Sequence, residues 1–147
     1  MAKGLQIRVL SLDDYERWMA VWKQAGLHSI RPEGRDSRVA FARQLESGTH
    51  SVIGLELDGE LAGVVLTTHD GRKGWINRLA VLPDYQWRGY ATRLVAEAEH
   101  VLRQQGMTVI AALIEPGNEA SLALFIELGY VDSQGMHYVS KRENSQS

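Results

Sequence analysis

The 147-residue chain contains no cysteine, only three prolines and no long apolar segment. Without cysteine it can form neither a disulfide framework nor a covalent cysteine intermediate. Its longest clean apolar run, residues 109–114, is far too short to span a bilayer. The N-terminus also lacks the apolar core of a signal peptide. These absences favour a cytoplasmic protein.

An excess of charge of one sign is lacking too, because 16 Lys and Arg stand against 18 Asp and Glu. The formal net charge of −2 gives no reason to expect nucleic-acid or membrane binding. The five histidines lack the paired spacing of metal ligands, so no metal site is expected. Neither a Gly-x-Ser-x-Gly nucleophile turn nor a Gly-Lys-Ser/Thr phosphate loop is present.

What is present predicts a single domain, residues 1–147, because 44% of the residues are hydrophobic and no linker or repeat is visible. Alternation and turn signals predict strands at about 5–10, 50–57, 60–68, 75–82 and 108–114, with Asp58-Gly59 as the hairpin turn between the second and the third. Helical periodicity and caps predict helices at about 11–24, 37–46, 90–105 and 118–128, with Asp36 or Ser37 as the cap of the second. A last hairpin is expected from residues 130–132 and 136–141, around Gln134-Gly135.

The chain is organised around residues 75–99, where a β-rich run stops at Pro83, a polar turn follows and an amphipathic helix begins. The first turn of a helix has amides without an intrahelical partner, and the helix dipole places partial positive charge there. Gly89 would let a ligand approach the backbone, and Arg88 adds a positive charge. This join is therefore predicted to hold a phosphate group, although an ordinary strand-to-helix turn is the alternative.

The longer pattern around this join is Gln86-x-x-Gly89-x-Ala91, preceded by Leu-Ala-Val-x-Pro at residues 79–83. It resembles the acetyl-CoA-binding motif of the GNAT N-acetyltransferase superfamily. Further along, Asn118 and the Leu-Gly-Tyr at 128–130 resemble the closing segment of the same family. The resemblance implies an α/β fold with a mixed, mostly antiparallel central sheet, a parallel βαβ acetyl-CoA-binding core and flanking helices.

The resemblance also implies which residues bind acetyl-CoA as co-substrate. Amides of the central strand would hold the pantetheine arm, the turn would hold the pyrophosphate, and two positions downstream would contact the same molecule. The implied residues are Leu79, Ala80, Val81, Gln86, Trp87, Arg88, Gly89, Tyr90, Ala91, Thr92, Asn118 and Phe125.

Two positions depart from the family pattern, so no catalytic residue is assigned. Phe125 stands where many relatives have a tyrosine that protonates the departing thiolate, and Asn77 stands where many have a glutamate. Glu115 is a possible substitute base, although a carboxylate at a strand end is commonly just a surface residue. His69 is a further candidate, because it lies one strand away from the expected site.

The first helix places Tyr15, Trp18, Met19 and Trp22 at helical spacing. A core face is the simpler interpretation, but relatives often build the acceptor pocket partly from the first two helices. Exposed tryptophans would indicate an interface, and a homodimer is possible.

The predicted function is transfer of acetyl from acetyl-CoA to a primary amine by direct attack in a ternary complex. The acceptor, a small molecule or a peptide or protein amine, is not identified by the sequence. A non-catalytic acyl-CoA-binding module of the same fold is the first alternative, which the departures at Phe125 and Asn77 allow. A domain that binds another phosphorylated ligand, such as a nucleotide, is the second.

Overall fold

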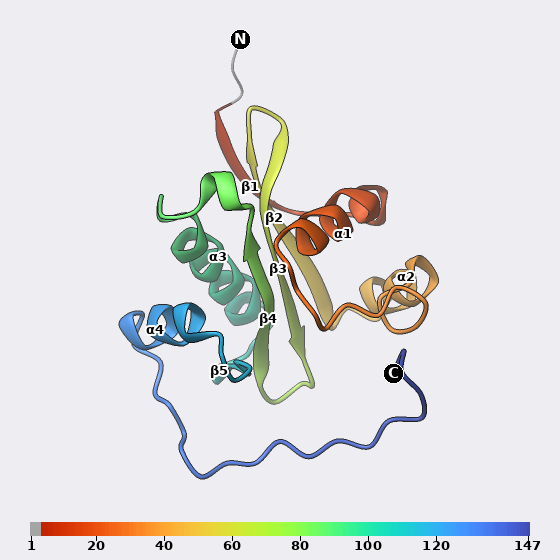
Figure 1. Cartoon of the computed structure of the whole chain (residues 1–147), viewed down its shortest axis with the longest axis vertical. Coiled ribbons are helices and arrows are strands. Elements are labelled where there is room, and N and C mark those ends of the chain that lie inside the picture. Colours follow the sequence, from red (N-terminus) through yellow and green to blue (C-terminus); the bar gives the residue numbers. More distant parts are fainter. Residues whose placement is uncertain (1–3) are drawn as a thin grey trace.

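The computed structural model describes residues 4–147 and contains a five-stranded sheet in the order β1-β2-β3-β4-β5 (Figure 1). The strands are β1 (Leu5–Val9), β2 (His50–Leu57), β3 (Glu60–His69), β4 (Gly74–Val81) and β5 (Ile110–Ala112). Neighbouring strands are antiparallel except β4 and β5, which are parallel. The mixed, mostly antiparallel sheet confirms the predicted fold class.

Helices cover both faces of this sheet (Figure 1). The short η1 (Leu12–Asp14) leads into α1 (Tyr15–Gln24), which lies with α2 (Arg38–Glu46) on one face. The other face is covered by α3 (Tyr90–Gln104) and α4 (Glu119–Glu127), and η2 (Pro83–Tyr85) lies between β4 and α3. Up to the end of α4, the order of elements is the predicted one.

Local signals explain where several of these elements begin and end. Ser37, rather than Asp36, caps α2, because its hydroxyl accepts a hydrogen bond from the Ala40 amide at 3.1 Å. Asp58 and Gly59 both adopt positive φ, which is the backbone of a tight turn that matches the twist of a hairpin. These short-range predictions are confirmed because a few neighbouring residues decide them.

The two faces of the sheet carry separate cores. Beneath α1 and α2, Trp18, Trp22 and Phe41 are fully buried with their rings in contact. Beneath α3, Leu94 and Leu102 pack on the opposite side of β2, β3 and β4. Each such side chain contributes about 1.5–3 kcal/mol through burial. The aromatic face of α1 is therefore core, as its spacing indicated.

The middle of β4 departs from regular pairing. Val64 is opposite Ala80 and Leu66 is opposite Asn77, so two residues of β4, Arg78 and Leu79, stand against one of β3. Arg78 has φ 52°, a left-handed conformation that non-glycine residues seldom adopt. This is a β-bulge, which breaks the ladder and redirects side chains.

Beside the bulge, the sheet opens. β5 pairs only with Gly74–Ile76 of β4, and it is shorter and less buried than the predicted run 108–114. Past Ile76 the two parallel strands have no further pairing. The opening therefore lies at their carboxyl ends, which is where α/β sheets commonly bind ligands.

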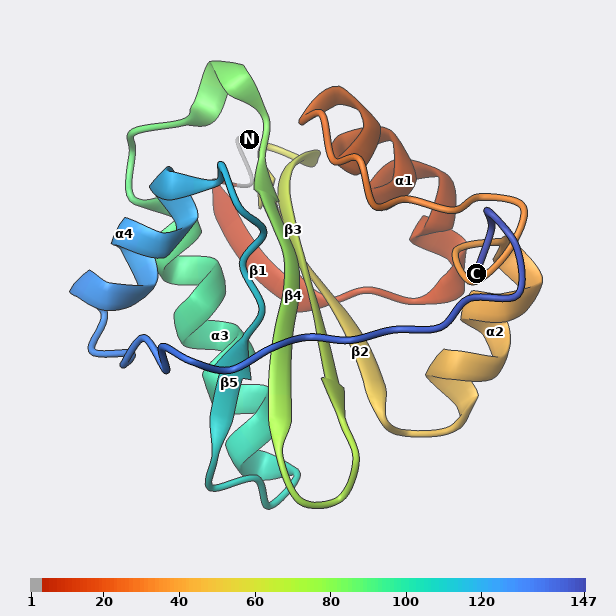
Figure 2. The same ribbon diagram turned by 60° about the horizontal axis from the view of Figure 1, so that its bottom comes forward.

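The predicted last hairpin is wrong. Residues 130–132 and 136–141 contain no strand, although the turn at Gln134-Gly135 is present. Their apolar side chains are largely exposed, at 87% for Val131 and 86% for Val139. An alternating pattern makes a strand only where a neighbour completes the ladder, and no described strand pairs with this segment. Instead it crosses in front of β5 and β4 in the view of Figure 2. Near its end, the Gln146 side chain accepts a hydrogen bond from the Glu33 amide at 3.1 Å.

Candidate active site

The turn before α3 exposes a row of backbone amides. Gly89 caps α3 with φ 82°, Trp87 has φ 66°, and the Arg93 amide is the first to bond back, to the Gly89 carbonyl at 3.2 Å. Within residues 4–147, the amides of residues 87–92 have no hydrogen-bond acceptor. Gln86 anchors the turn by donating from Nε2 to the Val81 carbonyl at 3.0 Å. Free amides at the positive end of a helix dipole suit an anionic group such as a phosphate.

The side chains of the turn leave the free amides accessible. Trp87 is 94% exposed, and a Cβ built on Gly89 would meet no atom within 4 Å. The Arg88 guanidinium lies 5.7 Å from the centre of the Tyr85 ring. Each of these groups is therefore open to solvent or to a ligand.

A cavity of about 910 Å³ lies beside the bulge, between the loop that joins α1 to α2 and the chain that follows β5. From β4 it is lined by Asn77, Arg78 and Leu79, and from the other side by residues 112–118 and Phe125. Tyr138 and Arg142 also line it, and both belong to the C-terminal segment that passes in front of β5 and β4 in Figure 2. Of the predicted site residues, five therefore line this cavity, whereas the turn at residues 86–92 is outside its lining; the five are Asn77, Leu79, Glu115, Asn118 and Phe125.

The three candidate catalytic residues lie in different surroundings. Asn77 lines the cavity and donates from Nδ2 to the Thr68 hydroxyl at 3.2 Å. Glu115 lines it from the loop after β5 and is exposed. His69 is outside the lining, and its Nδ1 accepts a hydrogen bond from the Gly71 amide at 3.1 Å. The structure thus brings Asn77 and Glu115 together and leaves His69 apart.

The two downstream positions already have structural roles. Asn118 caps α4, because its Oδ1 accepts a hydrogen bond from the Ser121 amide at 3.3 Å. Phe125 is 5% exposed and lies edge-on to the Tyr130 ring, with centroids 4.9 Å apart. The Tyr130 hydroxyl donates to Glu99 at 2.5 Å, and burial together with this carboxylate raises the pKa of Tyr130. The Tyr130 hydroxyl proton therefore points to Glu99, and Tyr130 is not among the residues that line the cavity.

The sequence did not reveal the ion pair that borders this cavity. Both Nη atoms of Arg78 donate to the buried Asp36 carboxylate, Nη2 at 2.9 Å. The Trp22 indole donates to the Arg78 carbonyl at 2.8 Å and its ring lies 5.4 Å from the guanidinium. These contacts tie the loop before α2 and the core of α1 to the bulge. No local pattern could predict a pair whose members are 42 positions apart.

His50 also lines the cavity, although the spacing of the histidines in the sequence did not indicate a site there. Burial, and to a smaller extent the charge of His69, lower the pKa of His50, so its ring is neutral at neutral pH. Its Nδ1 lies 2.9 Å from the Thr49 hydroxyl. The register between β2 and β3 places His50 opposite Thr68, the acceptor of the Asn77 hydrogen bond, and no local pattern in the sequence indicates this pairing.

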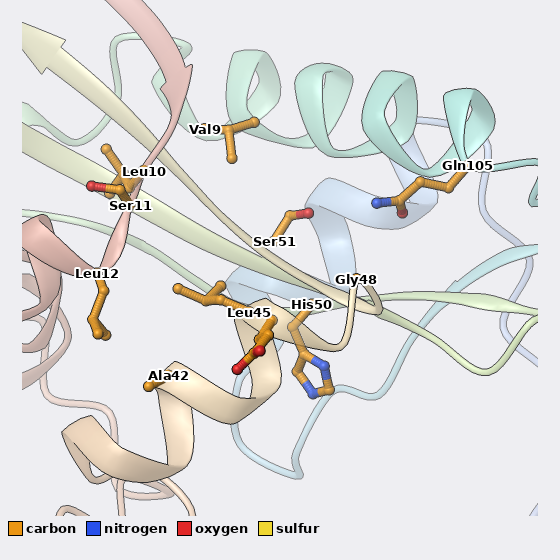
Figure 3. A pocket seen from close by; sticks show the side chains of 11 residues that line it. Val9, Leu10, Ser11, Leu12, Ala42, Leu45, Gly48, His50, Ser51 and Gln105 are labelled. Carbon is orange, nitrogen blue, oxygen red and sulfur yellow. The ribbon is translucent and has the colours of Figure 1, made fainter.

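A second hollow, of about 500 Å³, lies where β1 leaves the edge of β2 (Figure 3). Val9 and Leu10 line one side of it, Leu45 of α2 and Ser51 of β2 line others, and Gln105 lies at the end of α3. None of the predicted site residues lines this hollow. The cavity beside the β4 bulge is therefore the candidate active site.

The family model of the acetyltransferase (GNAT) family matches residues 11–130. The chain belongs to the GNAT family.

Within residues 4–147, no helix is long and apolar enough to cross a membrane. The same residues contain no group of three or more His, Cys, Asp or Glu placed to hold a metal ion.

Several acetyltransferases resemble this chain over nearly its whole length. An acetyltransferase of Yersinia pestis is 28% identical over 138 residues, which cover 94% of this chain and 95% of the relative. The aminoglycoside N-acetyltransferase AAC(6′)-Iy, solved with a CoA bisubstrate analogue, superposes with a TM-score of 0.79 at 19% identity, covering 95% of this chain and 99% of its own. An acetyltransferase of Clostridium acetobutylicum, solved with acetyl-CoA, gives a TM-score of 0.77 at 14% identity, covering 92% and 96%.

Proposed function

We propose that this GNAT protein transfers the acetyl group of acetyl-CoA to a primary amine, which attacks directly in a ternary complex. The observation that carries the proposal is the row of unbonded amides at residues 87–92, in a chain that also has a cavity at the open carboxyl ends of β4 and β5. Such a row fits the diphosphate of CoA, and the cavity leaves room for an acceptor. The CoA complexes of structural neighbours support the same reading.

In this proposal each segment of the site has one task. Acetyl-CoA supplies an acetyl group on a thioester, an activated carbonyl that an amine can attack. Residues 86–92 hold the phosphates, and the backbone of Leu79, Ala80 and Val81 beside the bulge holds the pantetheine arm. Asn118 and Phe125 border the same molecule from α4. Backbone donors preorganised at a reacting carbonyl usually give a large part of the rate enhancement.

The acceptor amine must lose a proton, and the cavity offers few groups to take it. Two carboxylates line it, Asp36 and Glu115, and Asp36 is held by Arg78. Glu115 is therefore the candidate base, directly or through water. Holding a lysine amine neutral at pH 7 costs roughly 4.6 kcal/mol, against about 1 to 1.4 kcal/mol for an α-amine. An exposed carboxylate is a weak base, which favours weakly basic amines.

Mass spectrometry tests the reaction. The protein is incubated with acetyl-CoA and a mixed library of amines and peptides, and N-acetylated products are sought. Acetylated products that depend on the protein support acetyl transfer. Binding of acetyl-CoA without any product, across the whole library, would favour the non-catalytic acyl-CoA-binding module.

Thermal unfolding tests the ligand. Acetyl-CoA at about 100 times its dissociation constant should stabilise the fold by roughly 2.7 kcal/mol. For a domain of this size that corresponds to a rise in Tm of about 5 to 10 °C. Nucleotides without the pantetheine arm should raise Tm less, because they leave the bulge of β4 uncovered. A Tm raised by a nucleotide and unmoved by millimolar CoA would promote the nucleotide-binding alternative.

A further inference from the structure

Three arginines line the cavity beside the bulge. Arg35 comes from the loop between α1 and α2, Arg78 from β4 and Arg142 from the C-terminal segment that crosses the sheet (Figure 2). Only two carboxylates, Asp36 and Glu115, line the same cavity. Cations therefore outnumber carboxylates in the lining, although the whole chain carries a net charge of −2.

Asp36 cannot balance all of this charge. Its carboxylate accepts hydrogen bonds from both Nη atoms of Arg78 and from the Arg31 amide, the last at 2.6 Å. The Arg35 Nε lies 4.0 Å from the same carboxylate, too far for a hydrogen bond. Arg78 and Asp36 therefore form a closed pair, and Arg35 remains outside it.

The two outer arginines keep donors for a ligand. Within the described residues, the Arg35 side chain donates one hydrogen bond, to the Ser29 carbonyl at 3.1 Å. Arg142 likewise donates one, to the main-chain oxygen of Ser147 at 2.8 Å. A guanidinium has five N–H donors, so each of the two has several left. Both are exposed, so a ligand in the cavity can reach them.

These positive charges lie close enough to repel each other. Burial, followed by the charges of Arg78, Arg142 and Arg31, lowers the pKa of Arg35, and Asp36 opposes the shift only in part. A guanidinium still remains protonated at neutral pH. Like charges held together destabilise one another, and an anion bound among them relieves this repulsion.

We propose that Arg35 and Arg142 form a subsite for an oxyanion on the acetyl acceptor, so that the acceptor is a small amine that also carries a carboxylate or a phosphate. This rests on the acetyl transfer proposed above. Glu115, from the loop after β5, attracts the ammonium end of such a molecule, and the arginines attract its anionic end. A purely cationic amine meets repulsion from the same arginines.

Matched acceptor pairs test the subsite. The pairs are alanine and alaninamide, isoglutamine and glutaminamide, and phosphoethanolamine and ethanolamine. Each pair has the same amine position and differs in one oxyanion, and the third pair separates phosphate from carboxylate. Calorimetry on the CoA-saturated protein measures Kd, and thiol release from acetyl-CoA measures kcat and KM. In at least one pair the anionic member should bind about tenfold more tightly, and added salt should shrink this preference.

Arginine variants locate the preference. Arg35→Gln and Arg142→Gln should each reduce it to threefold or less through KM, with kcat nearly unchanged, and Arg35→Lys should recover part of it. Arg43→Gln is the matched control, because Arg43 is exposed on α2 outside the cavity lining. No preference in any pair, or a preference that survives both glutamine variants, would overturn the subsite. An intact preference without any thiol release would instead contradict acetyl transfer and leave the anion subsite standing.

Discussion

At the scale of single residues, Gly89 is the position that most directly controls the proposed phosphate contact. Its φ of 82° strains any side chain, and the space around its Cβ position is open for a ligand. We expect Gly89→Val to weaken acetyl-CoA binding by tenfold or more, because a branched Cβ blocks the approach to the amides. Arg88→Ala should cost only a few-fold, because it removes one exposed charge and leaves the amides in place. Gly89→Ala is the control for backbone strain, and calorimetry compares all three. Parental affinity in Gly89→Val would remove the amide row from the site.

Asp36 is the residue on which the shape of the bulge depends. Its carboxylate is almost fully buried and Arg78 is nearly so, with side-chain exposures of 4% and 11%. Breaking a buried pair by removing one charge typically destabilises a protein by about 3–5 kcal/mol. We therefore expect Asp36→Asn to lower the free energy of unfolding by about this amount, measured by urea denaturation. The double variant with Arg78→Gln should regain part of the loss, since no unpaired charge then remains. An Asp36→Asn protein as stable as the parent would mean that the pair does not hold the loop to β4.

At the scale of the element, α4 presents one residue to both the core and the cavity. Phe125 is buried against Tyr130 and also lines the candidate active site. Phe125→Tyr places a hydroxyl at the cavity, and we expect it to preserve the fold and to leave kcat unchanged or raise it up to about tenfold. Phe125→Ala, by contrast, should cost about 3–5 kcal/mol of stability through the cavity it leaves. Steady-state kinetics and thermal melts separate the two effects. A large fall in kcat for Phe125→Tyr, with stability and acetyl-CoA affinity unchanged, would contradict this account of α4.

At the scale of the whole molecule, a half-buried ion network outside the cavity lining joins β1, β2 and α1. Glu56 accepts hydrogen bonds from Arg8 at 2.8 Å and from Arg17 at 2.8 Å. The hydrogen bond from Arg8 is the largest cause that lowers the pKa of Glu56. Burial raises this pKa in part, and the hydrogen bond from Arg17 lowers it further. Burial raises the pKa of Asp14, but hydrogen bonds from the Ser11 amide and from the same two arginines lower it by more, so the pKa falls below its ordinary value. The network therefore stabilises the folded state only while both carboxylates are ionised.

The sign of the pH dependence follows from these lowered pKa values. Between the folded and the unfolded pKa, the unfolded chain binds more protons, so stability rises with pH. The contribution is complete above the ordinary glutamate pKa of about 4.3 and is lost as pH falls through the lower folded value. Urea denaturation from pH 6 to pH 3 should show this loss, and Glu56→Gln should flatten the curve below about pH 5. A Glu56→Gln curve as steep as that of the parent would show that Glu56 is not part of the acid response.

Short-range information in the sequence was enough for much of the fold and for the proposed cofactor segment. The Asp58-Gly59 turn, the cap at Ser37 and the start of α3 at Gly89 depend on φ preferences and hydrogen bonds within a few residues. The same holds for the strand, turn and helix from β4 to α3, which carry the family motif. The residues that determine such an element are close together in the sequence, so a short stretch is enough to predict it.

Tertiary structure alone decided the rest of the site. Only packing of α1 and its following loop against β4 brings Asp36 to Arg78 and sets the positive φ at the bulge. Only the path of residues 131–147 across β5 places Tyr138 and Arg142 at the cavity and denies this segment a strand partner. The physical reason is that a ladder, a buried ion pair or a cavity lining needs groups that are distant in sequence, and their meeting depends on how the whole chain packs.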